Sequence, residues 1–346
     1  MDTFWSVRNT NVAFDVFAQG GMLRTVRFFL PDGRLVTPFY DAPWLKEVPP
    51  AAQTKSVVDY LGSEFVCLPF GGNYPPDSTQ VPGWRKALEN CSSGAGGKSP
   101  RGVVHGHSAA SRWHLVAMTM NSISIGIDYP ESSPIANVVR TVVAQESEAA
   151  LAFDVQITAR RPFRGPFGVH PNFSLVGAAG TVRVRPGRFA TGMVHPSLGG
   201  VATTRAAPGA SFTSIESVPA REGPPIDLSH LPLLGRTEEI VMLCGINGGV
   251  VLDYIAENVS CTISWDYALL PCAMLWVSNS GRNEAPWNSR NMCLGVEPLA
   301  SAFDLGETAS LNPNPISELG FPTVIEVTPD RDFSFSYKVS VDAVLQ

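Results

Sequence analysis

The sequence has little positive charge. Its 346 residues include 25 Lys and Arg against 31 Asp and Glu, which gives a net charge of -6. The basic residues are dispersed along the chain, apart from the group formed by Arg160, Arg161 and Arg164. A protein that binds nucleic acid instead gathers its basic residues on one face. We therefore expect no nucleic acid partner.

Long hydrophobic runs and a secretory leader are also missing. The longest nearly uncharged apolar run is ALLPCAMLWV, and it has about half the length that a membrane-spanning helix needs. The first residues, MDTFWSVRNT, lack a basic region followed by an apolar one. These absences predict a soluble, cytoplasmic protein without a membrane partner.

Motifs for metal, phosphate or nucleophile chemistry are incomplete. The six cysteines form no CxxC pair, which argues against a disulfide scaffold or a zinc knuckle. The stretch GGKS at 96–99 has Ser92 where a P-loop needs its first glycine, and Pro100 follows it. The stretch GHSAA at 106–110 resembles a nucleophile elbow, but it ends in Ala110 and no helix pattern follows. Ser108 is therefore a poor candidate nucleophile, and we expect no cofactor.

The chain is rich in segments whose apolar residues alternate with polar ones. This period of two is typical of strands with one buried face, and it occurs in NSISIGIDY, ALAFDVQIT, TVRVRPG and FSFSYKVSV. Turn-rich stretches separate these segments, the chain has 31 Gly and 29 Pro, and helical patterns are few. The segment GRTEEIVML fits a helix or a strand. The pattern predicts an all-β protein, a large antiparallel sandwich or barrel.

One domain over residues 1–346 is the simplest organisation of this pattern. The segment at 199–225 is rich in Pro, Gly and Ala and is the best candidate for a boundary. Strand-like sequence resumes after it, so we interpret it as a long loop.

Two histidines in HGHSAASRWHLV suggest a metal site. If this segment is a strand, His105 and His107 point to the same face, an arrangement that suits two metal ligands and resembles the cupin HxH motif. Cupins place a glutamate a few residues later, whereas Ala109, Ala110, Ser111 and Arg112 stand here. The missing carboxylate argues against a metal, and we predict no metal site.

The stretch PFGVHPNFSL places His170 between an apolar run and a proline. A structural explanation is that a strand ends before the proline and that its last residue is a hydrogen-bonded core histidine. A catalytic explanation needs partners elsewhere in the chain.

Such partners are suggested by a family resemblance. The segments LPFGGNYPP, HGHSAASRWHL, FGVHPNFSL, LLPCAMLWVSN and NMCLGVEPLAS occur in the order found in the galactose mutarotase (aldose 1-epimerase) superfamily. From about Leu68 to Leu311, the sequence resembles the mutarotase-related branch of that superfamily. Each segment is a weak signal alone, and their shared order makes the resemblance.

The resemblance implies a large antiparallel β-supersandwich with a sugar-binding cleft and no cofactor. It also implies that His170 is the general acid, Glu297 the general base and His105 a sugar-binding histidine. Opening a cyclic hemiacetal needs a proton removed from the C1 hydroxyl and one given to the ring oxygen, so an imidazole and a carboxylate suit the reaction. Taken without these partners, Glu297 is better explained as a strand-end carboxylate in water or paired with Arg290.

Further residues are candidates for sugar binding. Aromatic rings pack on the apolar face of a pyranose, and Trp276 fits this role, with Trp113 and Phe173 as weaker candidates. Members of the family often have an Asn-Arg pair, but here Tyr74 follows Asn73. We keep Asn73 as a candidate and expect another arginine, Arg112 or Arg85, to replace the missing one.

The sequence thus predicts an aldose 1-epimerase-like isomerase that acts on a monosaccharide or an anionic sugar derivative. Arg160, Arg161 and Arg164 either bind a phosphate or carboxylate of the sugar or form an exposed, solvated loop. The alternative functions are a noncatalytic carbohydrate-binding protein of the same fold and a cupin-like metal enzyme. A strand edge offers a surface for a homodimer.

Overall fold

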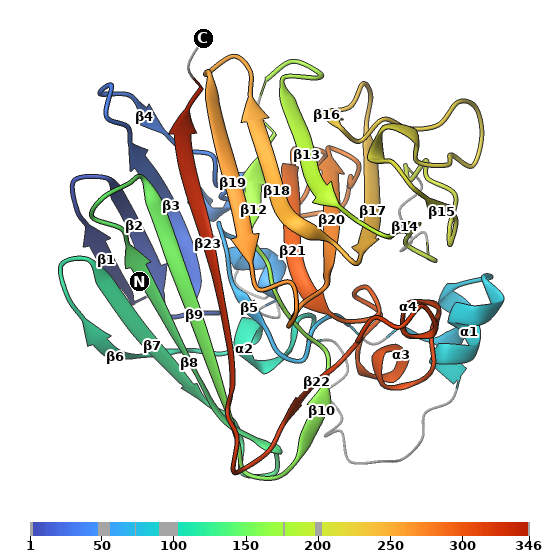
Figure 1. The fold of residues 1–346 in the computed structure, drawn as a ribbon, viewed down its shortest axis with the longest axis horizontal. Helices are drawn as coiled ribbons and strands as arrows, with labels where there is room; N and C mark the ends of the chain where they lie inside the picture. The colour runs from blue at the N-terminus through green and yellow to red at the C-terminus, as the bar shows by residue number, and fades with distance from the viewer. Residues whose placement is uncertain are drawn as a thin grey trace.

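The structure is a computed structural model that describes residues 3–47, 56–72, 74–89, 103–175, 177–197 and 203–344. Within these residues the named strands form four sheets (Figure 1). Neighbouring strands in the sheets pair antiparallel, as in the central pairs of the two large sheets. The predicted all-β, antiparallel architecture is confirmed.

The largest sheet has nine strands and contains the four alternating segments recognised in the sequence. Their order across the sheet is β16 (His230–Leu231), β13 (Val182–Arg188), β18 (Asn247–Tyr254), β19 (Val259–Trp265), β23 (Phe333–Ala343), β9 (Ala150–Ala159), β8 (Ile135–Ala144), β7 (Ser122–Asp128) and β6 (His114–Met118).

The second large sheet has eight strands and carries the candidate site. Its order is β15 (Ser211–Phe212), β14 (Thr191–Val194), β17 (Thr237–Cys244), β20 (Cys272–Asn279), β21 (Met292–Ala300), β11 (Phe167–Val169) and β5 (Val66–Cys67), and β12 (Asn172–Ser174) also pairs with β21. The ambiguous segment GRTEEIVML is therefore a strand, β17.

Two small sheets and short helices complete the described residues. The small sheets are β1 (Phe4–Arg8), β2 (Val12–Phe17), β3 (Met22–Phe29) and β4 (Leu35–Val36), and β10 (Phe163–Gly165) with β22 (Ile325–Val327). The α-helices are α1 (Pro82–Glu89), α2 (Gly106–Ala110), α3 (Glu307–Leu311) and α4 (Pro315–Glu318). The 3₁₀ helices are η1 (Pro43–Lys46), η2 (Val57–Tyr60), η3 (Pro76–Ser78) and η4 (Ile215–Ser217). Of the helices described, none has the length and apolarity to cross a membrane.

The eight-stranded sheet is buried on both faces. Along β20, Ala273, Leu275 and Val277 belong to the large core that the sheet shares with the nine-stranded and four-stranded sheets. The alternate residues Met274 and Trp276 belong to a second apolar cluster on the opposite face. This alternation follows from the period-two geometry of a strand. It places any functional side chain of the second face in a largely dry environment.

The segment predicted to be a long loop is described from residue 203 onward. Between 203 and 225 it has only the short strand β15 and the 3₁₀ helix η4. Its backbone is attached to the sheet by the buried Glu239, whose two carboxylate oxygens accept hydrogen bonds from the N–H groups of Arg205 and Ala206 at 2.9 and 3.0 Å. These described residues agree with the loop interpretation.

Candidate active site

His170 lies at a break between two short strands. β11 ends at Val169 and β12 begins at Asn172, so His170 and Pro171 separate them. The His170 N–H donates to the carbonyl of Phe65 at 2.9 Å, and the Pro171 carbonyl accepts from Val296 at 2.9 Å. His170 is 4% exposed, and its imidazole stacks on the Phe65 ring, with centroids 4.6 Å apart. The proline thus ends one strand and turns this histidine into the second apolar cluster.

Glu297 on β21 is the partner of His170. Its Oε1 lies 3.3 Å from His170 Nε2, and the residue is 0% exposed. Apart from this contact, neither carboxyl oxygen of Glu297 nor the Nδ1 of His170 has a hydrogen-bond partner among the described residues. Buried polar atoms are normally satisfied, so these orphaned atoms point to a ligand. Arg290 pairs instead with Glu47, at 3.0 Å between Nη2 and Oε2, which excludes the alternative pairing of Glu297 with Arg290.

Burial favours one shared proton on this pair. Burial raises the pKa of Glu297 well above its ordinary value, and the negative charge of Asp304 adds to the effect. Burial lowers the pKa of His170 well below its ordinary value, with a further contribution from His105. A carboxylic acid beside a neutral imidazole carries the same single proton as a carboxylate beside an imidazolium. The pair therefore contains one proton donor and one proton acceptor in either form.

The absence of a side chain at Gly295 makes room for this pair. Gly295 lies opposite Trp276 in the β20–β21 register. A Cβ at this position would lie 2.6 Å from Glu297 Oε1, 3.3 Å from His170 Cε1 and 3.3 Å from Trp276 Cβ. The contact with the carboxyl oxygen is too close, so the His170–Glu297 geometry depends on a glycine here.

Gly295→Ala is expected to displace the Glu297 carboxyl group and to destabilise the protein by about 1–3 kcal/mol, as overpacking does in cores. Urea unfolding measures the stability, and sugar binding or turnover measures the site. Ala300→Gly, on the same strand but facing the other core, is a control that changes β21 without crowding the pair. An alanine variant with unchanged stability and unchanged site properties would contradict this role of Gly295.

His105 reaches the same cluster from a tight turn and not from a strand. It precedes α2 with φ 62°, and Gly106 has φ 76°. A Cβ on Gly106 would lie 2.3 Å from the carbonyl oxygen of Leu68, so only glycine fits there. The His105 ring meets the His170 ring edge-on, with centroids 5.2 Å apart. His105 and His170 therefore lie together, as the family resemblance implied.

The strand that the HxH metal hypothesis assumed does not form. His107 lies within α2, where its Nδ1 is 3.0 Å from Ser111 Oγ and its Nε2 is 3.1 Å from the carbonyl of Asp128. Across the described residues, no three His, Cys, Asp or Glu side chains are grouped as a metal site requires. Ser108 is also structural, because its hydroxyl donates to Val66 and accepts from Leu68, both at 2.8 Å.

His105 is expected to make the protein sensitive to acid. Burial lowers its pKa from 6.5 to about 4, although the charge of Asp304 opposes this. Between these values the unfolded chain binds a proton that the folded chain does not, so stability falls as the pH falls from about 6.5 to about 4. At about 1.4 kcal/mol per pH unit, the loss approaches about 3 kcal/mol.

His105→Gln should flatten the dependence of unfolding free energy on pH in this range, measured by urea denaturation at several pH values. His230→Gln, which changes an exposed histidine, is the matched control and should keep the wild-type slope. Equal slopes for His105→Gln and the wild type would contradict the assignment.

Trp276 joins the cluster from β20 and connects it to an arginine that the sequence analysis missed. The Trp276 ring lies edge-on to His170, with centroids 5.7 Å apart, and its Nε1 donates to Glu238 Oε1 at 2.6 Å. Arg282 Nε donates to the same oxygen at 3.0 Å, and its guanidinium lies 5.1 Å from the centre of the Trp287 ring. The Arg282 side chain is 25% exposed. A guanidinium thus lies beside the aromatic side of the site.

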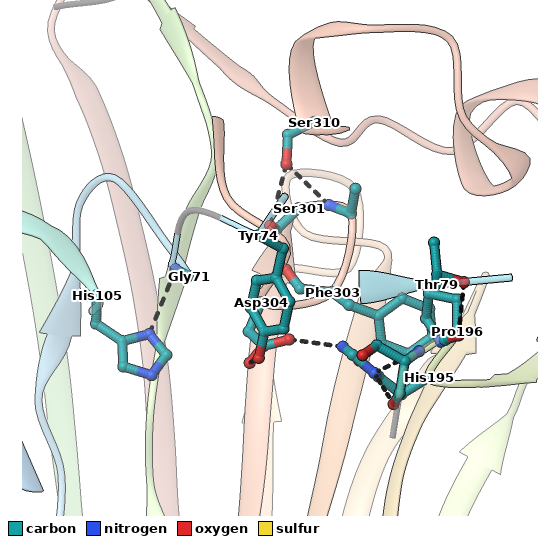
Figure 2. A network of polar contacts seen from close by, with 12 residues as sticks. Gly71, Tyr74, Thr79, His105, His195, Pro196, Ser301, Phe303, Asp304 and Ser310 are labelled. Atoms are coloured by element: carbon teal, nitrogen blue, oxygen red, sulfur yellow. Dashed lines mark hydrogen bonds and ion pairs between the residues drawn. The ribbon is translucent and has the colours of Figure 1, made fainter. Parts of the chain in front are cut away.

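A second histidine–carboxylate pair lies next to the first. His195 Nε2 is 2.8 Å from Asp304 Oδ1, and Tyr74 donates to Asp304 Oδ2 at 2.9 Å (Figure 2). The sequence contained a signal for it, because Val194, His195 and Pro196 repeat the Val-His-Pro order around His170. Both histidines follow a strand, β14 or β11, and both contact a carboxyl group.

Several candidate residues lie elsewhere. Arg112 is exposed and donates to Thr3 Oγ1, and Arg85 pairs with Glu89 on α1 at 3.0 Å. Trp113 and Phe173 are buried in the large shared core. Asn73 lies outside the described residues. The structure therefore does not bring Arg112, Arg85, Trp113 or Phe173 to the His170–Glu297 pair.

The arginines considered for an anionic sugar are also engaged away from the pair. Arg160 donates to the carbonyls of Ile135 and Tyr129 at 2.5 and 3.1 Å, and Arg161 donates to that of Ser132 at 2.6 Å. Arg164 pairs with Glu326 at 3.3 Å, and both side chains are largely exposed. Arg160 and Arg161 therefore lie in a loop held by hydrogen bonds to its neighbours, as one of the two interpretations expected, whereas Arg164 lies on strand β10 opposite Glu326.

Solved structures have a similar fold along nearly the whole chain. The candidate aldose 1-epimerase of Escherichia coli K12 has a TM-score of 0.65 at 15% identity, covering 99% of this chain and 100% of that protein. The GalM/aldose epimerase homologue of C. elegans has a TM-score of 0.64 at 13% identity, with 100% of both chains covered. The chain has the galactose mutarotase-like fold.

The galactose mutarotase-like fold is also that of the galactose mutarotase related enzyme of Lactobacillus acidophilus, with a TM-score of 0.59 at 11% identity and 99% of both chains covered. No protein-family model and no curated protein sequence matches the chain. At these identities the similarity establishes the fold alone. Any catalytic function depends on the chemistry of the His170–Glu297 pair.

Proposed function

We propose that the protein is an aldose 1-epimerase-like isomerase that interconverts the α and β anomers of a monosaccharide. The observation that carries this proposal is the fully buried His170–Glu297 pair, 3.3 Å apart, whose remaining polar atoms have no hydrogen-bond partner among the described residues. The galactose mutarotase-like fold supports it.

The reaction uses the single proton of the pair in a cycle. Glu297, as a carboxylate, removes the proton from the C1 hydroxyl, and the C1=O bond forms while the bond between C1 and the ring oxygen breaks. His170, as an imidazolium, gives its proton to the ring oxygen. Rotation about C1–C2 turns the other face of the carbonyl to this oxygen. On reclosure the ring-oxygen hydroxyl gives its proton back to His170 and Glu297 gives its proton to the C1 oxygen, so the pair is regenerated.

The surroundings of the pair assist both proton transfers. The fixed charge of Asp304 stabilises an imidazolium on His170 or His105, because it raises the pKa of both histidines against the effect of burial. Trp276 offers an aromatic surface next to His170, suited to the apolar face of a pyranose. Preorganised groups of this kind stabilise developing charge strongly, because little water competes with them.

Access to the pair requires a small rearrangement. Glu297 is not exposed, whereas the Asp304 and Arg282 side chains are 18% and 25% exposed. A sugar therefore approaches from the edge where these two residues lie and displaces side chains as it binds.

The test is anomer exchange measured by saturation-transfer NMR with the full chain. A panel of neutral, acidic and phosphorylated aldoses is compared with and without protein, and we expect accelerated exchange for at least one sugar. A folded protein that binds a panel member but accelerates no exchange would replace the proposal with a noncatalytic carbohydrate-binding function.

A further inference from the structure

The Asp304 carboxylate is a second polar centre beside the His170–Glu297 pair. Figure 2 shows the Asp304 carboxylate joined to His195 by a dashed line, with the Tyr74 side chain drawn over Asp304 in this view. Oδ1 of Asp304 contacts His195 and Oδ2 contacts the Tyr74 hydroxyl. The two contacts, 2.8 Å from His195 Nε2 and 2.9 Å from the Tyr74 hydroxyl, occupy one acceptor position on each oxygen. A carboxylate oxygen accepts more than one hydrogen bond. Asp304 therefore keeps acceptor capacity while its orientation is fixed.

The backbone around Asp304 is fixed as well. Its carbonyl accepts a hydrogen bond from the Gly72 N–H at 2.8 Å. A Cβ on Gly71 would lie 2.5 Å from that carbonyl oxygen, so the two segments touch closely. Phe303, immediately before Asp304, has φ 53°. Segments that are far apart in the sequence thus hold one carboxylate in place, as a preorganised binding group requires.

Asp304 differs from Glu297 in charge and in access to solvent. Its side chain is 18% exposed, whereas that of Glu297 is 0% exposed. Burial alone would raise the pKa of Asp304, but His195 and Tyr74 outweigh it and lower the pKa to about 2. Asp304 is therefore a permanent negative charge at the edge from which a ligand approaches, and Glu297 is a proton carrier behind it.

The described basic side chains near this edge already have partners. His195 is paired with Asp304, and Arg282 with Glu238 at 3.0 Å. His105 and His170 also face Asp304, but burial lowers the pKa of both. Arg160, Arg161 and Arg164 contact other parts of the chain. The Asp304 charge would repel an anionic substituent placed here, whereas sugar hydroxyls would donate hydrogen bonds to the carboxylate.

We propose that Asp304 is a further substrate-binding residue that accepts hydrogen bonds from sugar hydroxyls and selects neutral aldoses over phosphorylated or acidic ones. This inference rests on the proposed function, since it concerns the same site. His195 and Tyr74 are positioning residues, because they act on the substrate only through Asp304.

The experiment compares the wild type with Asp304→Asn, using a neutral aldohexose, its 6-phosphate and the corresponding uronate. Anomer exchange gives kcat and KM, and calorimetry gives binding. A hydrogen bond to a charged group is worth roughly ten- to a hundredfold in affinity. We expect the wild type to prefer the neutral sugar. Asp304→Asn should raise KM for that sugar by roughly ten- to a hundredfold and reduce the preference over both anions at least tenfold.

Two further variants are controls for Asp304→Asn. Asp227→Asn removes another aspartate paired with a histidine, His230 at 3.2 Å, at an exposed position, and should leave KM and selectivity unchanged. Tyr74→Phe keeps the ring and removes one donor to Asp304. It should raise KM by a smaller factor with the charge selectivity retained.

Each outcome separates the inference from the proposed function. Faster exchange of the sugar phosphate or the uronate than of the neutral sugar overturns the inference and leaves the isomerase proposal intact. A folded Asp304→Asn variant with KM and selectivity within twofold of wild type also overturns it. Binding of the neutral sugar without exchange, lost in Asp304→Asn, upholds the inference and refutes the isomerase. Absence of binding and of exchange for all three sugars overturns both.

Discussion

Glu297→Gln is expected to lower kcat for anomer exchange by about a hundred- to ten-thousand-fold, the range over which general acid-base groups contribute. The amide has nearly the shape of the carboxyl group, but it cannot remove a proton from the C1 hydroxyl. His170→Asn should have an effect of similar size, because the two residues share one proton across 3.3 Å. Their effects should not add, since residues acting as a unit lose most of their function together. Saturation-transfer NMR on both single variants and the double variant measures this.

The same Gln substitution should not destabilise the protein at alkaline pH. The pKa of Glu297 is raised in the folded state, so the folded chain binds this proton more tightly than the unfolded chain. The corresponding stability is present below the unfolded pKa, about 4.3, and is lost as the pH rises through the folded pKa. The Tm of Glu297→Gln relative to wild type should therefore increase with pH. A decrease, or a Gln variant with full activity, would contradict the assigned role; Glu148→Gln at an exposed ion pair is the control.

Arg140→Leu is expected to destabilise the protein by about 3–5 kcal/mol, the cost of leaving a buried ion without its partner. Arg140 and Glu64 are fully buried and form an ion pair in the large core. Glu64 also accepts a hydrogen bond from the Tyr337 hydroxyl at 2.5 Å, and Arg140 donates to the carbonyl of Gly21 at 2.6 Å. The leucine variant retains apolar volume but leaves the Glu64 carboxylate unpaired.

Urea denaturation measures this loss, and a double variant tests its cause. Replacing both members, as in Arg140→Leu with Glu64→Leu, removes the uncompensated charge and should recover much of the stability, as buried pairs replaced by apolar residues often do. Arg85→Leu, which breaks the exposed pair with Glu89, should cost less than about 1 kcal/mol. A loss for Arg140→Leu no larger than for Arg85→Leu would contradict the interpretation.

The long strands were predictable because their burial alternates within a continuous segment. In β9, Leu151, Phe153 and Val155 face the core while Asp154 and Gln156 are exposed, so local sequence suffices. The short strands β5, β11 and β12 have no such pattern, because they are fixed by pairing with β21 or with each other. The strand assumed for the HxH motif is absent for the same reason. The turn at His105 and Gly106 is set by the backbone of Leu68, which is distant in sequence.

The candidate site was predictable where the family resemblance covered it. His105, His170, Trp276 and Glu297 lie together, as their motif order suggested. Arg282 was missed because its place depends on its ion pair with Glu238, which is distant in the sequence. Asp304 was missed because its partners, Tyr74 and His195, come from distant segments. The repeated Val-His-Pro order was the available signal for His195.

The most direct test of the account is whether the protein accelerates anomer exchange of a neutral aldose and whether Glu297→Gln abolishes it. Saturation-transfer NMR on the wild type and the variant, with folding verified for both, gives the answer in one series. We predict accelerated exchange by the wild type and a kcat lower by about a hundredfold or more with Glu297→Gln. Equal acceleration by the two proteins, or none by a wild type that binds the sugar, would contradict the proposal that the His170–Glu297 pair opens the ring.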